Sequence, residues 1–394
     1  MTNKQKFLFF PYAFVLYEIA IYLSNDMYLP SMPAIAKDLF FSQEQIQYTL
    51  TFWFLGASSL QFILGPLSDS YGRRYITIIN GILYVISSAA CAMSASLPIL
   101  LLARFMQGAT ICALIAGYAA IHEMYSTKQA IKILAFTNAV SILAPAFGPL
   151  FGALLVQFAT WRYIFWLLTV LGIVSTILLF IVMPESNHNK HKLVFRVFMR
   201  DYVRILLNKD FMLACISYCL LVSVFFIWMF EAPFLLIEVY KKSNLFYGIA
   251  QTAVFSCFFL GAWFTKIILS RLSLKQLLSI GTAIAVCGAI LLAMIAKMYD
   301  EVVRSVICMM LLSTGASMLF APINRIAIES CTEPMGRRTA VISTILSLFG
   351  ALCGWILAMV QAHSLVKISL LITACIALSA ILLVQIKVPE LIED

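Results

Sequence analysis

Residues 65–74 read GPLSDSYGRR, and they join two long apolar stretches at 45–67 and 75–95. The two glycines permit a tight turn, because glycine adopts backbone conformations that other residues avoid. The aspartate can accept hydrogen bonds from nearby helix-end N–H groups, and the two arginines can anchor to lipid headgroups. The residues in these roles are Gly65, Asp69, Gly72, Arg73 and Arg74. The segment therefore predicts a tight, positively charged turn between two membrane-spanning helices.

The composition also predicts a membrane protein. Of the 394 residues, 62% are hydrophobic and 11% are charged, and the mean hydropathy is +0.97. A water-soluble domain carries roughly a quarter charged residues, so this chain lacks the polar surface that such a domain needs. Each of twelve apolar stretches is long enough to cross a hydrocarbon core of ~30 Å. They run approximately over 8–29, 45–67, 75–95, 98–123, 130–157, 160–183, 211–237, 245–270, 275–296, 304–329, 338–360 and 365–388. The expected fold class is an all-α membrane protein with twelve transmembrane helices.

The basic residues predict the orientation of these helices. If the N-terminus is cytoplasmic, seventeen of the 27 Lys and Arg residues lie on the cytoplasmic side and seven on the other, with Arg104, Lys266 and Arg325 inside helices. Cytoplasmic loops of membrane proteins carry such an excess. We therefore expect a multi-pass protein of the bacterial inner membrane with both termini in the cytoplasm. The net charge of +9 is then a topology signal that faces anionic lipid, and it does not indicate nucleic-acid binding.

The longest polar connection divides the chain into halves. It carries PESNHNKHK and then the basic, amphipathic stretch VFRVFMRDYVRILLNK, which predicts a helix lying on the cytoplasmic membrane surface. The expected domains are a six-helix bundle at 1–184, a linker at 185–209 and a second six-helix bundle at 210–394. Phe54-Leu55-Gly56-Ala57 recurs as Phe259-Leu260-Gly261-Ala262, 205 residues later, as parallel repeats would predict.

Other functional classes receive little support from the sequence. Nine of the ten cysteines lie in apolar runs without repeated metal-ligand spacing, and the four histidines form no cluster. We therefore expect no metal site, and the absence of a nucleophile–base pair argues against a membrane enzyme. The loops are too short for the signalling domain of a sensor. No nucleotide-binding motif is present, so ATP is not the expected energy source.

Three further motifs accompany GPLSDSYGRR, namely LLARFMQG at 101–108, LAPAFGPLFG at 143–152 and FPYAFVLYEIAIYLSNDMYLP at 10–30. With these motifs the chain resembles the major facilitator superfamily and, within it, the MdfA-type multidrug/proton antiporters of the Bcr/CflA drug-resistance group. The resemblance covers essentially the whole chain. It implies two six-helix bundles around a central cavity, no cofactor, and transport driven by a proton gradient.

The resemblance also assigns roles to two of the motifs. The turn of Gly65, Asp69, Gly72, Arg73 and Arg74 resembles a latch that stabilises the outward-open state by pairing across the halves. Glu123, at the end of the fourth stretch, is the expected partner of this latch. The motif at 143–152 resembles that of drug/proton antiporters, where prolines kink the helix and a GxxxG face admits close packing. Its residues are Pro145, Gly148, Pro149 and Gly152.

Three charged residues lie deep within the apolar stretches. Glu18 and Asp26 are eight residues apart, so on a helix they share one face at a separation of about 12 Å. Arg104 lies at a depth similar to that of Asp26. A charge at such depth is costly unless it faces a cavity or a partner. The resemblance implies proton coupling by Asp26, Glu18 and Arg104, with Glu18 as a contact for lipophilic cations. The alternative is an Asp26–Arg104 ion pair that only locks two helices together.

Further candidates for the substrate site are the polar and aromatic residues near these charges, namely Tyr22, Asn25, Tyr118, Phe226 and Trp228. Glu231, beside Pro233 in the seventh stretch, departs from the resembled pattern. It is a third buried carboxylate that would favour dicationic substrates or carry a second proton, or it pairs with a backbone group near the proline kink.

Two transport hypotheses follow. The first is a monomeric antiporter that exports small lipophilic drugs, cationic or neutral, in exchange for protons. The second is proton-driven export of an endogenous metabolite, such as a siderophore or an amino-acid derivative. Proton-coupled uptake is a third arrangement of the same fold, but the motif at 143–152 favours exchange. Membrane lipid, protons and a small-molecule substrate are the expected partners.

Overall fold

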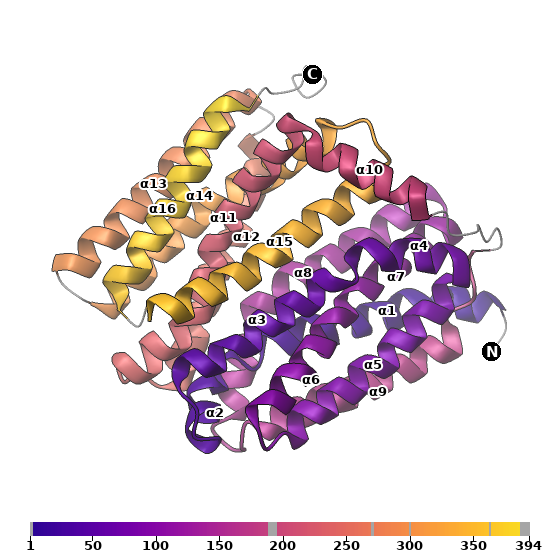
Figure 1. Ribbon diagram of the computed structural model, residues 1–394, viewed down its shortest axis with the longest axis horizontal. Helices are drawn as coiled ribbons and strands as arrows, with labels where there is room; N and C mark the ends of the chain where they lie inside the picture. The colour runs from indigo at the N-terminus through magenta and orange to yellow at the C-terminus, as the bar shows by residue number, and fades with distance from the viewer. Residues whose placement is uncertain (1–2, 188–194, 269–271, 299–300, 362–363, 387–394) are drawn as a thin grey trace. The chain divides into compact units, whose positions relative to one another are not determined.

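The computed structural model describes residues 3–187, 195–268, 272–298, 301–361 and 364–386. Every regular element in these ranges is helical. The chain forms two compact units, Met1–Phe195 and Arg196–Asp394, which are called unit 1 and unit 2 below (Figure 1). The predicted linker at 185–209 spans the point where unit 1 ends and unit 2 begins. The basic residues Lys190, Lys192 and Arg271, and the predicted helix ends at 270 and 388, lie outside the described residues.

Unit 1 is built from nine α-helices and two short 3-10 segments among its described residues. These elements are α1 (Asn3–Asp26), η1 (Leu29–Ser31), α2 (Met32–Asp38), α3 (Gln43–Ser59), α4 (Gln61–Tyr71), α5 (Arg73–Met93), α6 (Leu97–Ala109), η2 (Thr110–Ala113), α7 (Leu114–Met124), α8 (Thr127–Leu155) and α9 (Arg162–Val182). The helices α5 and α9 run side by side (Figure 1). Helix α1 packs against both α8 and α9.

Unit 2 contains seven α-helices and one π-helical segment in its described part. They are α10 (Phe195–Leu207, starting at the last residue of unit 1), α11 (Lys209–Pro233), the π-helix η3 (Phe234–Val239), α12 (Asn244–Ile268), α13 (Leu274–Met298), α14 (Val302–Glu329), α15 (Met335–Val360) and α16 (Leu365–Gln385). Helix α13 packs against both α14 and α16. Helix α11 packs against α14, α15 and α16.

The helices are long and apolar enough to cross a membrane, as the sequence predicts. Ten described spans meet this condition, and the bent pair α3 and α4 adds an eleventh. Helix α8, whose apolar part is Leu143–Leu155, occupies the predicted stretch at 130–157. The structure therefore has a helix, or a broken helix, at each of the twelve predicted positions.

The predicted turn at 65–74 is wrong in its extent. Most of GPLSDSYGRR is helical, because α4 continues to Tyr71 and α5 begins at Arg73. Only Gly72 interrupts the helices, at a φ of 112°, which glycine adopts at little cost. A separate bend lies within the second predicted span, at Leu60, where α3 and α4 meet at 44°. Gly65 lies inside α4, and a Cβ there would meet no other atom within 4 Å.

Several other predicted spans are interrupted helices. The first stretch is α1 followed by η1 and α2, where Pro30 and Pro33 remove backbone donors. The fourth is α6 and α7, joined by the 3-10 turn η2. The seventh changes from α11 to the π-helix η3 directly after Pro233. Such interruptions leave the apolar pattern unchanged, so hydropathy does not reveal them.

Helix α10 coincides with the amphipathic stretch found in the sequence. Tyr202 and Ile205 are buried, whereas Met199 and Val203 are exposed. The buried carboxylate of Asp201 forms an ion pair with Arg337, in the first turn of α15. The Arg337 guanidinium also lies 4.5 Å from the centre of the Phe198 ring. Helix α10 is therefore fixed to unit 2 by a charged contact as well as by apolar packing.

Candidate functional site

The carboxylates of α1 lie in the interior of unit 1. Glu18 is fully buried, and Asp26, the last residue of α1, is 5% exposed. The Asn25 side-chain amide donates to Asp26 Oδ1 at 3.1 Å. Because α1 is apolar along most of its length and packs on two neighbours, its few polar groups sit among buried side chains. Asp26 and Asn25, both predicted site residues, thus share one polar position at the end of the helix.

Arg104 reaches the same end of α1 from α6. Its side chain is fully buried, and Nη1 donates to the Ser24 carbonyl oxygen at 2.7 Å and to Gln107 Oε1 at 2.6 Å. Gln107 Nε2 in turn donates to Ser88 Oγ of α5 at 2.8 Å. Arg104 therefore ties α1 to α5 and α6, and it does so through a backbone carbonyl of α1.

Aromatic rings and unused donors complete the surroundings of Arg104. The guanidinium carbon lies 4.5 Å from the centre of the Tyr28 ring and 6.0 Å from that of Phe165, so the ring faces partly offset the buried charge. Within the described residues, its Nε and Nη2 atoms have no hydrogen-bond partner, and it forms no ion pair with Asp26. The buried arginine thus retains hydrogen-bonding capacity close to the aspartate.

Glu18 belongs to a second polar contact, made with helix α7. The Tyr118 hydroxyl donates to Glu18 Oε1 at 2.6 Å. The Tyr118 ring packs edge-on against Phe14, one turn before Glu18, with ring centres 5.4 Å apart. Tyr22 is half-buried on α1, and, like Tyr118, it packs against the apolar cluster that contains Phe14. The structure therefore brings together three predicted residues: a carboxylate, a phenol and a partly exposed aromatic ring.

Helix α8 packs directly on the end of α1 that carries Asp26. A Cβ added at Gly148 would lie 2.9 Å from the Asp26 Cβ, and one added at Gly152 would overlap the Met27 carbonyl. Only glycine permits this approach of the two helices. Pro149 lies within α8 between these contacts, and Pro145 lies three residues before Gly148. The sequence indicated close packing by this motif but did not indicate that Asp26 lies beneath it.

The predicted latch residues form an ion-pair cluster within unit 1. Arg73, at the start of α5, pairs with Asp69 of α4 and with Glu123 of α7, whose Oε1 lies 3.0 Å from Arg73 Nη2. Arg73 Nη1 also donates to Ser68 Oγ at 2.5 Å. Arg74 instead points toward α9, where its Nη2 donates to the Phe180 carbonyl at 2.8 Å. Glu123 thus contacts Arg73 within unit 1, and its role as the partner of a latch between the halves stays a prediction.

The cluster is completed by three residues of the predicted linker that follow α9, namely Glu185, Ser186 and Asn187. Glu185 Oε1 accepts from the Arg73 backbone N–H at 2.8 Å, and so caps the first turn of α5. The Asn187 side chain donates to the Asp69 carbonyl at 2.7 Å, and Ser186 Oγ donates to Glu123 Oε2 at 2.5 Å. A carboxylate at a helix N-terminus is favoured by the helix dipole. The proximity of Glu185 to the segment GPLSDSYGRR depends on the three-dimensional fold.

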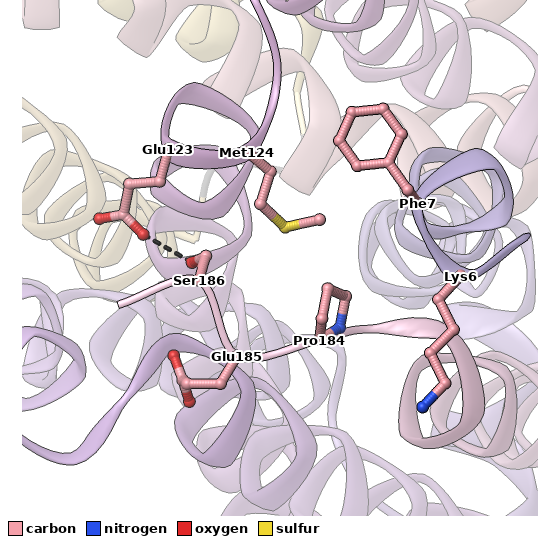
Figure 2. A pocket seen from close by; sticks show the side chains of 7 residues that line it. All are labelled: Lys6, Phe7, Glu123, Met124, Pro184, Glu185 and Ser186. Atoms are coloured by element: carbon pink, nitrogen blue, oxygen red, sulfur yellow. Dashed lines mark hydrogen bonds between the residues drawn. The ribbon is translucent and has the colours of Figure 1, made fainter. Parts of the chain in front are cut away.

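A cavity of about 300 Å³ lies beside this cluster. It is lined by Lys6, Phe7, Glu123, Met124, Pro184, Glu185 and Ser186. Figure 2 shows the Glu185 carboxylate pointing away from Lys6 and Phe7, and Ser186 bonded to Glu123. The cavity is thus lined in part by Glu123, Glu185 and Ser186, which also belong to the cluster around Arg73.

The candidates in unit 2 form a separate group on α11. Glu231 is fully buried, Trp228 is 1% exposed and Phe226 is half-buried. Trp228 Nε1 donates to Gln251 Oε1 of α12 at 2.8 Å. Gln251 is a buried polar residue that the sequence analysis did not select, although its amide within an apolar helix was a visible signal. Glu231 lies just before the change from α-helix to π-helix.

Comparison with known proteins relates most of the chain to membrane transporters. The sequence pattern of the Major Facilitator Superfamily matches residues 14–354. The Chloramphenicol resistance protein CraA of Acinetobacter baumannii is 29% identical over 86% of this chain and 83% of its own length. The Multidrug transporter MdfA of Yersinia pestis is 33% identical over 73% of this chain and 70% of its own.

Solved structures agree with the fold. The xylose transporter XylE from E. coli, in a partially occluded inward-open conformation, superimposes with a TM-score of 0.74 over 97% of this chain and 98% of its own, at 13% identity. A bacterial homologue of the human lysosomal transporter Spinster gives a TM-score of 0.73 over 96% and 95% of the two chains, at 14% identity. At such identities the likeness concerns the fold alone.

Proposed function

The chain belongs to the major facilitator superfamily, and we propose that it exports small lipophilic drugs from the cytoplasm in exchange for protons. It is a multi-pass membrane transporter and not an enzyme. The similarity to MdfA and CraA supports the choice of drugs, cationic or neutral, as substrates. Transport proceeds by alternating access, in which a substrate site opens to one face of the membrane and then to the other.

The observation that carries the proposal is the environment of Asp26. This buried carboxylate ends α1 beneath Gly148, and Arg104 binds the carbonyl of Ser24 two residues earlier. A charged carboxylate at this depth is stable only with a partner or with water, whereas burial of the protonated form costs far less. Arg104 keeps two donors for the charged form. A small movement of α1 against α8 would therefore change the preference of Asp26 for its proton.

The transport cycle follows from this property. A proton entering from outside the cell neutralises Asp26, weakens its attraction for a cationic drug, and favours the return to the inward-facing state. When the site faces the cytoplasm, the arriving drug displaces the proton. Proton and drug thus oppose each other's binding, and this opposition is reciprocal. The proton gradient is the energy source, and no cofactor takes part.

Glu18 is the proposed contact for the positive charge of a cationic substrate. Its carboxylate accepts from the Tyr118 hydroxyl at 2.6 Å, and that hydrogen bond favours the charged form. Tyr22 and Asn25 lie farther along α1 and extend the proposed surface toward Asp26. In unit 2, Phe226 and Trp228 contribute aromatic surface to substrate binding. Aromatic faces suit lipophilic cations and neutral aromatic drugs alike.

The proposed location is the bacterial inner membrane, with both termini in the cytoplasm and the chain acting as a monomer. The excess of Lys and Arg on one side of the predicted spans supports this orientation. The cluster of Asp69, Arg73 and Glu123 then lies at the cytoplasmic end of unit 1 and acts as a conformational latch. Membrane lipid surrounds the transporter.

The test is a transport assay with the full chain in liposomes that contain a pH-sensitive dye. A proton gradient is imposed, and tetraphenylphosphonium or chloramphenicol is added. We expect substrate-dependent proton movement in the wild type, its loss in Asp26→Asn, and a loss confined to the cation in Glu18→Gln. Glu301→Gln, which removes an exposed carboxylate paired with Arg304, is the matched control and retains coupling.

Two outcomes would contradict parts of this proposal. Full coupling in Asp26→Asn would remove the aspartate from the proton pathway. No proton movement with any drug, in wild-type protein shown to be folded, would overturn drug export and leave export of an endogenous metabolite, which the same assay examines with siderophores and amino-acid derivatives.

A further inference from the structure

The two units repeat one another in their helix packing. In unit 1, α1 contacts α8 and α9, α3 contacts α6, and α5 contacts α9. In unit 2, the helices in the same order make the same pairs: α11 contacts α15 and α16, α12 contacts α14, and α13 contacts α16. The repeat suggested by the recurrence of Phe-Leu-Gly-Ala therefore extends to the three-dimensional arrangement of each unit.

The offset of 205 residues also holds for individual contacts. Gly56 of α3 packs against the backbone of α6, where an added Cβ would lie 2.9 Å from the Ala109 nitrogen. Gly261, 205 residues after Gly56, packs against α14, where an added Cβ would lie 2.5 Å from the Thr314 oxygen. Thr314 is itself 205 residues after Ala109. The same offset thus aligns both partners of an inter-helix contact.

Applied to Asp26, this offset gives Glu231. Asp26 is 5% exposed and ends the first helix of unit 1, and Glu231 is fully buried two residues before the end of α11. Each carboxylate is followed within a few residues by a proline and a segment that is not α-helical, η1 or η3. The two units therefore place a buried carboxylic acid at equivalent positions.

The two units differ at the position of Arg104. The position equivalent to Arg104 is Met309, a buried apolar residue of α14. An arginine near a carboxylate favours its charged form, and a methionine does not. In an apolar helix a carboxylic acid avoids the cost of a buried charge by holding a proton. Glu231 is thus placed to bind a proton in at least one state of the cycle.

Charged and titratable groups on the described elements around α11 lie at both ends of unit 2. At the end of unit 2 that carries Glu231, Arg304 pairs with Glu301 at 2.8 Å, and Lys241 lies 3.8 Å from Glu238. Lys367 donates to the Val360 and Gln361 carbonyls. Tyr247 is a buried phenol of α12 at this end. The charged groups toward the other ends of the packed helices are Lys266, Arg325, Glu329, Arg337 and Arg338.

We propose that Glu231 is a second proton-binding carboxylate, the counterpart of Asp26 in unit 2, so that each cycle carries one more proton than Asp26 alone. This proposal rests on the proposed proton antiport. Glu231 takes its proton from outside the cell and releases it to the cytoplasm, and no other reactant is required. The π-helix after Pro233 gives α11 a joint at which the acid can change its exposure, and π-helical turns are frequent at functional sites.

The consequence is measurable as electric charge. Export of one monovalent cation against two protons moves one net positive charge inward per cycle, and the membrane potential then drives transport. Export against a single proton is electroneutral. Loss of Glu231 should therefore convert tetraphenylphosphonium export from a potential-driven into a potential-independent process, while a pH gradient still drives it.

The experiment measures tetraphenylphosphonium flux by the full chain in liposomes at set combinations of pH gradient and potassium diffusion potential. The combination at which net flux vanishes gives the number of protons per cation. We expect this number to fall by half in Glu231→Gln and to remain at the wild-type value in Glu231→Asp, which keeps the acid. Tetraphenylphosphonium binding to each detergent-solubilised variant shows that the fold and the substrate site persist.

The outcomes separate this proposal from the proposed function. An unchanged proton number in a transporting Glu231→Gln variant overturns the role of Glu231 and leaves proton antiport intact. A variant that binds but no longer transports, together with a Glu231→Asp variant that also fails, overturns it in favour of a structural role. If wild-type flux ignores the pH gradient altogether, proton antiport itself fails, and the proton role of Glu231 fails with it.

Discussion

The Cβ of Asp26 lies against Gly148, so closely that a methyl group added at Gly148 would come to 2.9 Å from it. The antiporter-type motif of α8 is therefore in direct contact with the carboxylate proposed to bind the proton. Movement of α8 relative to α1 cannot leave the position of Asp26 unchanged. The motif thus has a physical connection to proton coupling beyond the kinking of its helix.

The substitution Gly148→Ala is expected to uncouple transport. The added methyl group must displace Asp26 or separate α1 from α8, at a cost of about 1–3 kcal/mol. We expect proton movement per substrate to fall while drug binding changes little. Gly336→Ala is the matched control, because a Cβ at Gly336 meets no atom within 4 Å. Proteoliposome flux with both variants checks this, and normal coupling in Gly148→Ala would contradict it.

The Tyr118 hydroxyl is expected to select for cationic substrates. Tyr118→Phe removes the hydrogen bond to Glu18 Oε1, and a hydrogen bond to a charged group contributes about 1.5–3 kcal/mol. We expect the affinity for tetraphenylphosphonium to fall by about tenfold or more, because Glu18 loses a hydrogen bond that favours its charged form. The affinity for chloramphenicol should change little, since this drug carries no positive charge to pair with Glu18. Equilibrium binding of both drugs measures the difference.

A second tyrosine near the end of α7 provides the control. Tyr125→Phe also removes one buried hydroxyl, but its partner is the Phe7 carbonyl and no carboxylate takes part. This variant should treat the two drugs alike. Equal changes for both drugs in Tyr118→Phe would show that the hydroxyl acts on the fold and not on the charge of Glu18.

Much of the fold was predictable because a membrane imposes a strong rule on the sequence. Every span needs about 20 apolar residues, so the twelve stretches and the all-helical class were visible directly. The interruptions at Leu60 and η2, and the π-helix η3, were not visible, because each changes the backbone without changing the hydropathy. The helical state of most of GPLSDSYGRR was missed for a related reason, since glycine and proline in a membrane helix resemble a turn in sequence.

The candidate site was predictable where a charged side chain stood out in an apolar helix. Glu18, Asp26, Arg104 and Glu231 were found in this way. Their partners were harder to find, because Arg104 binds the backbone carbonyl of Ser24, and every residue offers a carbonyl. Contacts between distant segments, such as Glu185 with α5, depend on the packing of six helices and leave no local pattern.

The contact between Gly72 and Glu185 is expected to show strong coupling. Gly72 has a φ of 112°, and an added Cβ would overlap the Glu185 carboxylate. Gly72→Ala should destabilise unit 1 by about 1–3 kcal/mol, and Glu185→Ala by about 1 kcal/mol through loss of the cap on α5.

A double-mutant cycle measures the interaction of these two substitutions. The double variant should be destabilised by less than the two single effects combined, because Glu185→Ala removes the group with which the Gly72→Ala methyl collides. Thermal unfolding in detergent reports all four stabilities. Simple additivity would mean that the backbone conformation of Gly72 alone sets the cost.

The ion pair between Asp201 and Arg337 is expected to stabilise unit 2 more than an exposed pair does. Asp201 is 7% exposed, and it faces an arginine in the first turn of α15, where the helix dipole disfavours a positive charge. Asp201→Asn removes the negative charge that faces Arg337, and the expected cost is about 1–3 kcal/mol. Glu301→Gln breaks the exposed pair with Arg304 and should cost at most ~1 kcal/mol.

Thermal unfolding of the two variants at low and high salt separates these effects, since salt screens the exposed pair far more than the buried one. Equal, salt-sensitive losses would show that α10 is held by apolar packing of Tyr202 and Ile205 alone.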